Sequence, residues 1–227
     1  MFYTSTNSSV YSNPPTDPGR KLLSPRFLRH SAVIYVDYPS TASLQLIYTT
    51  FSRAALKNTG NLISYAEPLS EAMVDFYQQS QRQFTPDQHP HYVYSPRELT
   101  RWVHGLAEFI SSTDVYSIES LLKIWAYEAL RLFSDRLVTE KERQWTLSSL
   151  ETIGQKYFPG VNISKCLSDP LLYTSWISRS FCQVSIDEMR EFMREKLKAF
   201  CEEEVDTNLV FFDEVLDHVL RIDRAFR

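Results

Sequence analysis

The sequence predicts a mainly α-helical protein, and three observations support this prediction. Apolar residues recur at helical spacing through residues 40–158. Two helix starts carry the serine and glutamate of a capping box, at Ser95–Glu98 and at Ser185–Glu188. Only two short apolar runs, 32–36 and 209–212, have the character of strands. With 43% hydrophobic and 14% aromatic residues among 227, the chain is expected to fold around real cores.

The first 39 residues are predicted to be mostly irregular, with one buried strand. Residues 13–20 are rich in proline and other turn formers, so they are expected to form a loop. Residues 32–36 are apolar and rich in β-branched side chains, and turn-forming residues bound them at 37–40. This pattern predicts a buried strand of the parallel type.

Five basic residues lie between that loop and that strand without an acid among them: Arg20, Lys21, Arg26, Arg29 and His30. A solvated face is the simplest interpretation. A nucleic-acid patch is less favoured, because single-strand binders interleave aromatic and basic residues. A phosphate sensor is the third alternative, since an arginine at the end of a strand can reach a γ-phosphate across a subunit boundary as an arginine finger.

Residues 40–158 are predicted to form a bundle of about five helices. The first two each present four apolar residues on one face: Leu44, Ile47, Tyr48 and Phe51, and then Leu69, Met73, Phe76 and Tyr77. The third helix follows Ser95. The fourth and longest is defined by Ile118, Leu121, Leu122, Trp125, Ala129, Leu132, Phe133 and Leu137. A weaker fifth helix covers about 141–157 and ends at the Phe158-Pro159-Gly160 turn.

The start of the third helix is closely specified. Ser95 is the expected N-cap, Pro96 takes the first helical position, and Glu98 completes the capping box. Arg97 falls in the first turn, where the helix dipole disfavours a cation by roughly 0.3–1 kcal/mol and attracts anions. Either Arg97 is exposed or paired with a carboxylate, which the pattern alone favours, or it shares a phosphate with the helix end. The apolar face that follows consists of Leu99, Trp102, Val103 and Leu106.

Other polar groups in this region suggest no independent chemistry. The charged residues of the fourth helix are predicted to form intrahelical pairs on a solvated face: Glu128, Arg131, Asp135 and Arg136. His89 and His91 flank a proline near Asp87, and the extended backbone would make the two imidazoles diverge, so no metal site is predicted. No Ser/His/Asp or Cys/His set indicates a catalytic centre.

Residues 160–184 are predicted to be loop-like, and two more helices follow. The first begins after Ser185 and has Met189, Met193, Leu197 and Phe200 on one face. The strand-like run 209–212 comes next. Asp213 is predicted to cap a last helix whose apolar face comprises Val215, Leu216, Val219, Ile222 and Phe226.

Composition excludes several classes of function. The net charge of −4 gives no global basic field for nucleic acid or an acidic surface. The three cysteines are far apart and form neither a disulfide framework nor a zinc pattern, which indicates a reducing cytosol. No apolar run is long enough to span a membrane. No Gly-Lys dipeptide occurs, so this chain has no phosphate-binding Walker A loop of its own.

With these residues in view, the chain resembles the cytoplasmic dynein heavy chain family, specifically the end of its third AAA+ module and the start of its fourth. The segments that carry the resemblance are residues 13–20, 26–30, 91–92, 94–99, 124–131 and 217–224. The Tyr-Ser-Pro-Arg-Glu form of 94–98 looks more like cytoplasmic than axonemal dyneins. The resemblance implies a mainly α fold: a helical AAA+ lid bundle, a residual strand and loop of the preceding α/β subdomain, and a strand-helix start of the next module.

The resemblance implies a division of the chain into four parts. Residues 1–39 would be the C-terminal remnant of the large α/β subdomain, with the sensor-1 and arginine-finger region. Residues 40–160 would be the helical lid, 161–204 a connecting extension with one helix, and 205–227 the start of the next module. Residues 8–12 depart from the family, which has an apolar strand at that place.

The resemblance also implies roles for individual residues. Asn13 matches the sensor-1 asparagine. Arg29 best matches the arginine finger that serves the preceding module, with Arg26 as the second candidate. Arg97 matches the sensor-2 arginine, which touches the phosphates of its own module. The segment beside adenine in the next module is matched by Leu209, Val210 and Phe211. No metal ligand is implied.

The implied function is that of a fragment of an ATP-driven motor that moves toward microtubule minus ends. The full-length parent would use ATP or ADP with Mg²⁺, whereas the isolated chain, without Walker A and Walker B, is expected to bind none and to be inactive. Expected partners are the neighbouring AAA+ modules and, through the parent, intermediate chains, light chains and microtubules, with no nucleic acid and no membrane. The expected location is the cytoplasm and its cytoskeleton. The alternative is a stand-alone all-α protein-interaction module without nucleotide chemistry.

Overall fold

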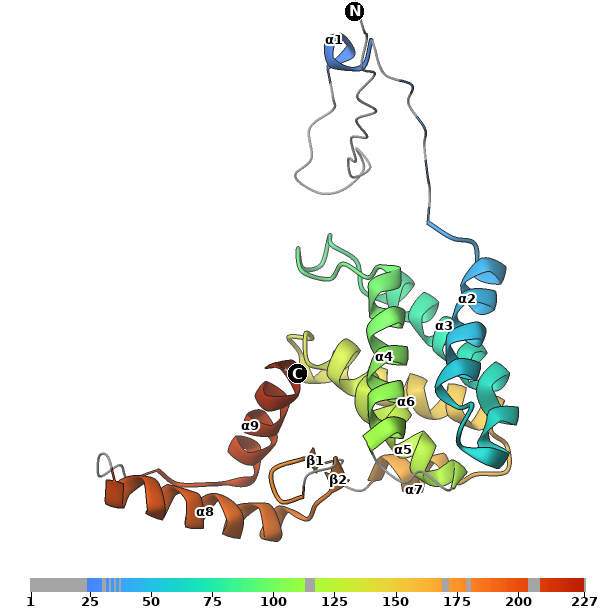
Figure 1. The fold of residues 1–227 in the computed structure, drawn as a ribbon. Helices are drawn as coiled ribbons and strands as arrows, with labels where there is room; N and C mark the ends of the chain where they lie inside the picture. The colour runs from blue at the N-terminus through green and yellow to red at the C-terminus, as the bar shows by residue number, and fades with distance from the viewer. Residues whose placement is uncertain are drawn as a thin grey trace, which may run out of the picture. The chain divides into compact units, whose positions relative to one another are not determined.

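A computed structural model describes residues 24–29, 32, 34, 36, 38–112, 117–168, 172–178, 181–203 and 209–226 (Figure 1). It contains two compact units, Met1–Tyr38 and Pro39–Arg227. Its described part is mainly helical, as the sequence predicts, and has only one small sheet. No helix among the described residues is both long enough and apolar enough to cross a membrane.

Among its described residues the first unit has one short helix, α1 (Pro25–Leu28), and the backbone N–H of Arg29 donates to the carbonyl of Pro25 at 3.0 Å. The predicted strand at 32–36 is wrong at the positions described. Ala32, Ile34 and Val36 lie outside any strand, and Ile34 and Val36 are 83% and 78% exposed. The described part of this unit contains no strand, and a parallel strand needs neighbouring strands to bond its backbone and cover its faces.

The second unit begins with the predicted five-helix bundle, which the structure confirms. Its main helices are α2 (Thr41–Ala55), α3 (Ala66–Gln83), α4 (Pro96–Ser112), α5 (Ile118–Ala129) and α6 (Glu140–Tyr157). A 3₁₀ turn, η1 (Gly60–Tyr65), precedes α3, and α5 continues into the π-helical turn η2 (Leu130–Ser134). Figure 1 shows α2, α3 and α4 packed side by side, and α6 lies against α3.

The predicted loop at 160–184 contains regular structure that the sequence pattern did not reveal. The described residues form α7 (Ile163–Ser168) and an antiparallel pair, β1 (Tyr173–Thr174) and β2 (Cys182–Gln183). The strands have two residues each, too few to show an alternating pattern. Helices α8 (Ile186–Glu203) and α9 (Asp213–Phe226) follow.

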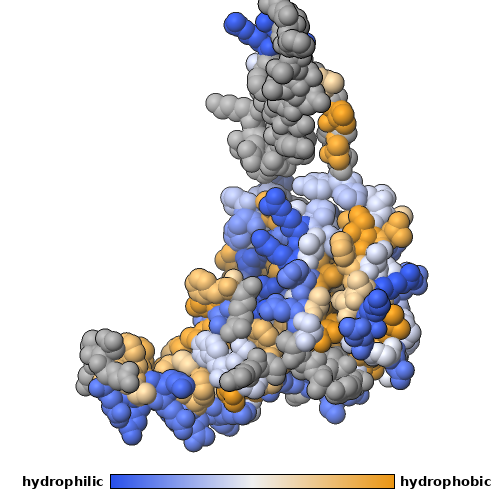
Figure 2. Space-filling model, viewed as in Figure 1, coloured by the Kyte–Doolittle hydropathy of each residue, from blue (hydrophilic) through white to orange (hydrophobic). Residues whose placement is uncertain are grey.

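The run 209–212 is not a strand, which corrects the second strand prediction. It has no regular structure, and Leu209, Val210 and Phe212 are exposed. No strand among the described residues of this unit pairs with it, since β1 and β2 pair with each other. Figure 2 shows hydrophobic colouring in this region, above α8.

The bundle core is aromatic and lies where α3, α4, α5 and η2 meet. Trp102 stacks on Trp125 with ring centroids 5.4 Å apart, and Phe76 and Phe133 meet edge to face at 5.0 Å. All four side chains are buried. A smaller second cluster joins α8 and α9 and consists of Leu172, Val184, Met189, Leu216 and Leu220.

Two predicted apolar faces are only partly buried. On α2, Leu44 and Tyr48 are buried, whereas Ile47 and Phe51 are exposed together with Leu46. This exposed apolar surface of α2 is also coloured as hydrophobic in Figure 2. On α9 the buried residues are Leu216, Leu220 and Arg224, and the predicted members Ile222 and Phe226 are exposed. The periodicity of apolar residues identifies an amphipathic helix. It does not show which of those apolar residues neighbouring helices will bury.

Candidate functional site

The first turn of α4 is capped largely as the sequence predicts. The backbone N–H of Ser95 donates to Glu98 Oε2 at 2.8 Å, which is one half of the capping box. The Ser95 hydroxyl donates to the same carboxylate oxygen at 3.1 Å and accepts from the N–H of Arg97 at 3.4 Å. The other half of the box is therefore shifted by one residue, because the hydroxyl bonds the second N–H of the helix and not the third.

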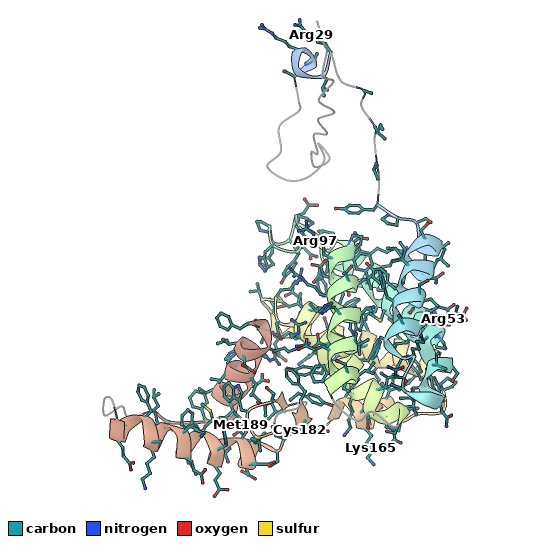
Figure 3. All side chains as sticks on the ribbon, in the orientation of Figure 1. Arg29, Arg53, Arg97, Lys165, Cys182 and Met189 are labelled. Carbon is teal, nitrogen blue, oxygen red and sulfur yellow. The ribbon has the colours of Figure 1, made fainter. Side chains whose placement is uncertain are left out.

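Arg97 is exposed at the N-terminal end of α4, where Figure 3 labels it. No ion pair joins it to another described residue. Glu98, the adjacent acid, is buried and pairs with Arg136, whose Nη2 lies 3.3 Å from Glu98 Oε1. Among the described residues, no carboxylate therefore neutralises the charge of Arg97, which stays at the positive end of the helix dipole.

Three side chains from α2 and α3 hold the backbone around Arg97. The Tyr48 hydroxyl donates to the Pro96 carbonyl at 2.7 Å and lies 3.0 Å from the Thr100 hydroxyl. Tyr77 and Gln81 both donate to the Tyr94 carbonyl, at 3.5 and 3.2 Å. Burial raises the pKa of Tyr48, so its hydroxyl stays protonated as a donor. Sequence reasoning placed Tyr48 and Tyr77 on apolar faces and missed these polar roles.

A second polar cluster lies beside the other end of α4 and corrects the prediction of a solvated face on the fourth helix. The Glu128 side chain is completely buried, at 0% exposure. Its Oε2 accepts from Arg131 Nε at 3.1 Å and Nη2 at 2.6 Å, and this part is the predicted intrahelical pair. Its Oε1 accepts from Arg224 Nε of α9 at 2.9 Å. A carboxylate without water contact requires such partners, and one of the two, Arg224, comes from another helix.

Arg224 is the residue of α9 that enters this cluster. Its Nη1 donates to Glu108 Oε2 at 2.7 Å, and its guanidinium lies over the rings of Phe109 and Phe181 at 5.0 and 5.2 Å. Burial lowers the pKa of Arg224, but the Glu128 and Glu108 carboxylates together outweigh it and raise the pKa, so the group remains a cation. The set Glu108, Glu128, Arg131 and Arg224, of which Glu128 and Arg224 are buried, is called the α9 anchor below. A surface ion pair between Arg221 and Asp135 supports the same contact.

Gly105 leaves the space that the Glu128 carboxylate fills. A Cβ at this position would lie 2.6 Å from Glu128 Cδ and in contact with Oε2. The carboxylate cannot easily retreat, because Arg131 and Arg224 hold both of its oxygens. The sequence gives no signal for this requirement, since a glycine inside a helical pattern suggests only a weaker helix.

Gly105→Ala is therefore expected to lower the free energy of unfolding by about 1–3 kcal/mol, the usual cost of overpacking. Alanine in an open helix interior would instead stabilise by roughly 0.5–1 kcal/mol. The measurement is urea unfolding of the 227-residue chain. Gly160→Ala is the matched control, because nothing lies within 4 Å of a Cβ there. A stabilising Gly105→Ala would contradict the crowding argument.

The remaining sequence-predicted site residues belong to neither of these clusters. Arg26 and Arg29 are exposed in the first unit, and Asn13 lies outside the described residues. Leu209 and Val210 are exposed, and Phe211 is half-buried. These three line a shallow groove with Arg194, Leu197, Lys198 and Cys201 of α8.

The histidine pair of the 84–95 loop has a structural explanation. The predicted divergence of the two imidazoles is wrong: the rings of His89 and His91 are 5.6 Å apart, because the N–H of Tyr92 donates to the His89 carbonyl at 2.9 Å and closes a turn. His91 Nε2 donates to the carbonyl of Arg136 at 3.1 Å. Across the described ranges, no group of three or more His, Cys, Asp or Glu side chains could hold a metal ion.

Comparisons with known proteins show which sequences this chain is similar to. Residues 51–143 match the family model described as dynein heavy chain, ATPase lid domain. The chain is 58% identical over 215 residues to the cytoplasmic dynein heavy chain of Drosophila melanogaster, which covers 95% of this chain and 5% of that protein. The counterparts in Fusarium vanettenii and Dictyostelium discoideum are 54% and 51% identical over 215 residues, again 95% of this chain.

The matched region is small in relation to these relatives, since the chain spans only 5% of the Drosophila and Fusarium proteins and 4% of the Dictyostelium protein. Within the chain, the lid match begins inside α2 and ends inside α6, so it contains α3, α4 and α5 entirely. It therefore includes the capped start of α4 with Arg97. The chain belongs to the dynein heavy chain family through this ATPase lid, and over nearly its whole length it is similar to one short segment of the cytoplasmic members.

Proposed function

We propose that this chain acts as part of the AAA+ ring of a dynein motor, as the end of the third module, its lid and the start of the fourth. The lid would carry Arg97 to the phosphates of its own module's nucleotide as the sensor-2 residue. The observation that carries this proposal is the exposure of Arg97 in the first turn of α4 while Glu98 is occupied by Arg136. A cation held at the positive end of a helix, without a described partner, is suited to an anion shared with that helix end.

The nucleotide itself would be held elsewhere in the ring. ATP or ADP with Mg²⁺ would supply the phosphates, bound by a Walker A loop outside this chain. The residues present here fit a contributing role, since Arg97 can donate to phosphate oxygens through a planar guanidinium. By adding positive charge where phosphate charge must be stabilised, Arg97 would favour the closed position of the lid.

Other residues would act toward neighbouring modules. Arg29, or Arg26 as the second candidate, would serve as the arginine finger for the preceding nucleotide, and the exposure of both side chains supports this role. Asn13 would be the sensor-1 residue. Leu209, Val210 and Phe211 would lie beside adenine in the next module, which their apolar character suits. Through the parent, the partners would be the adjacent modules, intermediate and light chains and microtubules of the cytoskeleton.

The central test is Arg97→Ala in an intact heavy chain that carries this segment. The affinity of the third module for nucleotide is expected to fall about tenfold or more, since hydrogen bonds to charged groups contribute about 1.5–3 kcal/mol. Titration with a fluorescent ATP analogue measures it, with the phosphate loops of the other modules inactivated. Arg101→Ala, one turn further on the same helix and also exposed, is the matched control. Equal affinity of wild type and Arg97→Ala would reject the sensor-2 role.

A separate expectation concerns the 227-residue chain alone. Because it contains no Gly-Lys dipeptide, it is expected to bind the same fluorescent analogue weakly or not at all and to leave ATP unhydrolysed. The measurement is a direct titration combined with an assay of phosphate release. Micromolar binding by this chain would show that it holds a nucleotide site of its own.

A further inference from the structure

We propose that Arg136 is a positioning residue for Arg97, which it controls by fixing the first turn of α4. This inference rests on the proposed function, because it concerns how Arg97 is aimed at phosphate. Arg136 follows η2, 39 positions after Arg97 in the sequence, and its own side chain is largely buried, at 22% exposure.

The guanidinium of Arg136 ties three parts of the lid together. Its Nε donates to the Leu132 carbonyl at 3.0 Å, which fixes the side chain on its own helical turn. Its Nη1 donates to the Val93 carbonyl at 3.1 Å, and its Nη2 lies 3.3 Å from Glu98 Oε1. All three nitrogens are used, and the second and third bonds hold the chain on both sides of the α4 cap.

An aromatic stack holds the same guanidinium from a second direction. Its Cζ lies 4.9 Å from the centroid of the Tyr94 ring. That ring stacks on Phe133 of η2, with centroids 5.6 Å apart and an interplanar angle of 7°. Arg136 thus packs on the residue before the cap and pairs with the residue after Arg97, so it brackets the turn that carries the proposed sensor.

The first turn of a helix needs such external support. Its backbone N–H groups have no partners within the helix, and helix ends fray. Pro96 contributes no N–H, and Arg97 is exposed without an ion pair to a described residue, so its direction depends on the backbone of residues 95–98. Of the side chains that hold this turn from outside α4, Tyr48, Tyr77 and Gln81 are neutral, and Arg136 is a cation that binds the capping carboxylate itself.

The geometry requires arginine at this position. A planar fork can reach Leu132, Val93 and Glu98 with three separate nitrogens and stack on Tyr94 at the same time. A lysine keeps the charge but has one donor group, so Arg136→Lys is expected to restore only part of the function. Arg136→Met keeps most of the side-chain volume and removes both the charge and the donors.

The first experiment measures the positioning itself in the 227-residue chain. In Arg136→Met, hydrogen exchange at the backbone amides of Ser95, Glu98 and Leu99 is expected to accelerate about tenfold, the effect of losing one charged hydrogen bond. Arg143→Met is the matched control. Arg143 lies in the first turn of α6, pairs with Glu140 and donates to Leu137, and it makes none of these contacts to α4. Unchanged exchange at the α4 amides in Arg136→Met overturns the inference, whatever Arg97 does.

The second experiment is a double-mutant cycle in the intact heavy chain, read out as nucleotide affinity of the third module. Arg136→Met alone is expected to weaken binding several-fold although Arg97 is present. In the Arg97→Ala background it is expected to cause little further loss, since a residue that acts through another is non-additive with it.

The outcomes separate the two proposals. Additive losses would mean that Arg136 supports the lid in general, and they would overturn the positioning role. Wild-type affinity in Arg136→Met, with reduced affinity in Arg97→Ala, would overturn it as well and leave the proposed function intact. Wild-type affinity in Arg97→Ala would reject the proposed function and, with it, any effect of Arg136 through that residue. Faster exchange, a non-additive loss of affinity and partial rescue by Arg136→Lys together support the inference.

Discussion

Glu128→Gln is expected to lower the free energy of unfolding of the Pro39–Arg227 unit by about 3–5 kcal/mol, as when one partner of a buried ion pair is removed. The substitution preserves the shape of the side chain, removes its charge and replaces one acceptor oxygen by an NH2 donor. Arg131 and Arg224 would then face a neutral amide in a place where water cannot replace the lost carboxylate. Urea unfolding of the 227-residue chain measures the change without adding salt that would screen charges.

The matched control is Glu119→Gln, an exposed glutamate in the first turn of the same helix. It is expected to change stability by no more than about 0.5 kcal/mol, as surface substitutions usually do. Hydrogen exchange should localise the effect of Glu128→Gln, because α9 reaches the bundle through Arg224 and its amides should lose protection. A loss below about 1 kcal/mol, or unchanged protection of α9, would mean that the α9 anchor does not stabilise this contact.

The helices were predictable because their signals are local. The apolar spacing of α3, α5 and α6 and the capping sequence before α4 lie within the segments that fold, so no distant contact is needed to recognise them. The α9 anchor could not be found in this way. Glu128 and Arg224 are 96 positions apart, and four charged residues on one helix suggest a solvated face unless their partners are known.

The two strand predictions failed for a related reason. An apolar run is a strand only when neighbouring strands bond its backbone, and the sequence of 32–36 or 209–212 says nothing about neighbours. In the described structure the side chains of Ile34 and Val210 are exposed, and neither residue belongs to the one described sheet, which consists of β1 and β2. Conversely, β1 and β2 pair only two residues with two. Strands this short leave no periodic pattern in the sequence by which they could be predicted.

The candidate site was half predictable. Ser95, Pro96 and Glu98 identify the helix start and place Arg97 in its first turn, but the side chains that hold this turn from outside α4 come from 13 to 48 positions away. The resemblance to dynein lids is confirmed by the family match and by identities above 50% across most of the chain. Those identities also favour the ring fragment over a stand-alone interaction module.

Trp102→Ala is expected to cost about 3–5 kcal/mol of unfolding free energy, the usual range for a large aromatic residue removed from a core. The indole is fully buried, stacks on Trp125, and meets Phe76 edge to face with centroids 5.8 Å apart. Its Nε1–H donates to the Trp125 carbonyl at 3.0 Å. Helices α3, α4 and α5 therefore all lose contacts, and the cavity lies where rigid neighbours cannot close it.

Two further variants test the cause of this loss. One separates the packing of the Trp102 ring from its hydrogen bond, and the other tests whether removing a different tryptophan has the same effect. Trp102→Phe keeps a ring but removes the N–H that donates to the Trp125 carbonyl, so it is expected to cost less than Trp102→Ala. Trp176→Ala removes a half-buried tryptophan of the smaller cluster, whose ring is 6.5 Å from Phe192, and should cost less than either if the bundle core dominates stability. Urea unfolding followed by circular dichroism gives the order. Of these two tryptophans, only Trp102 lies at the α3–α4–α5 junction. Equal losses of unfolding free energy for Trp102→Ala and Trp176→Ala would therefore show that the stability of the unit is not centred on that junction.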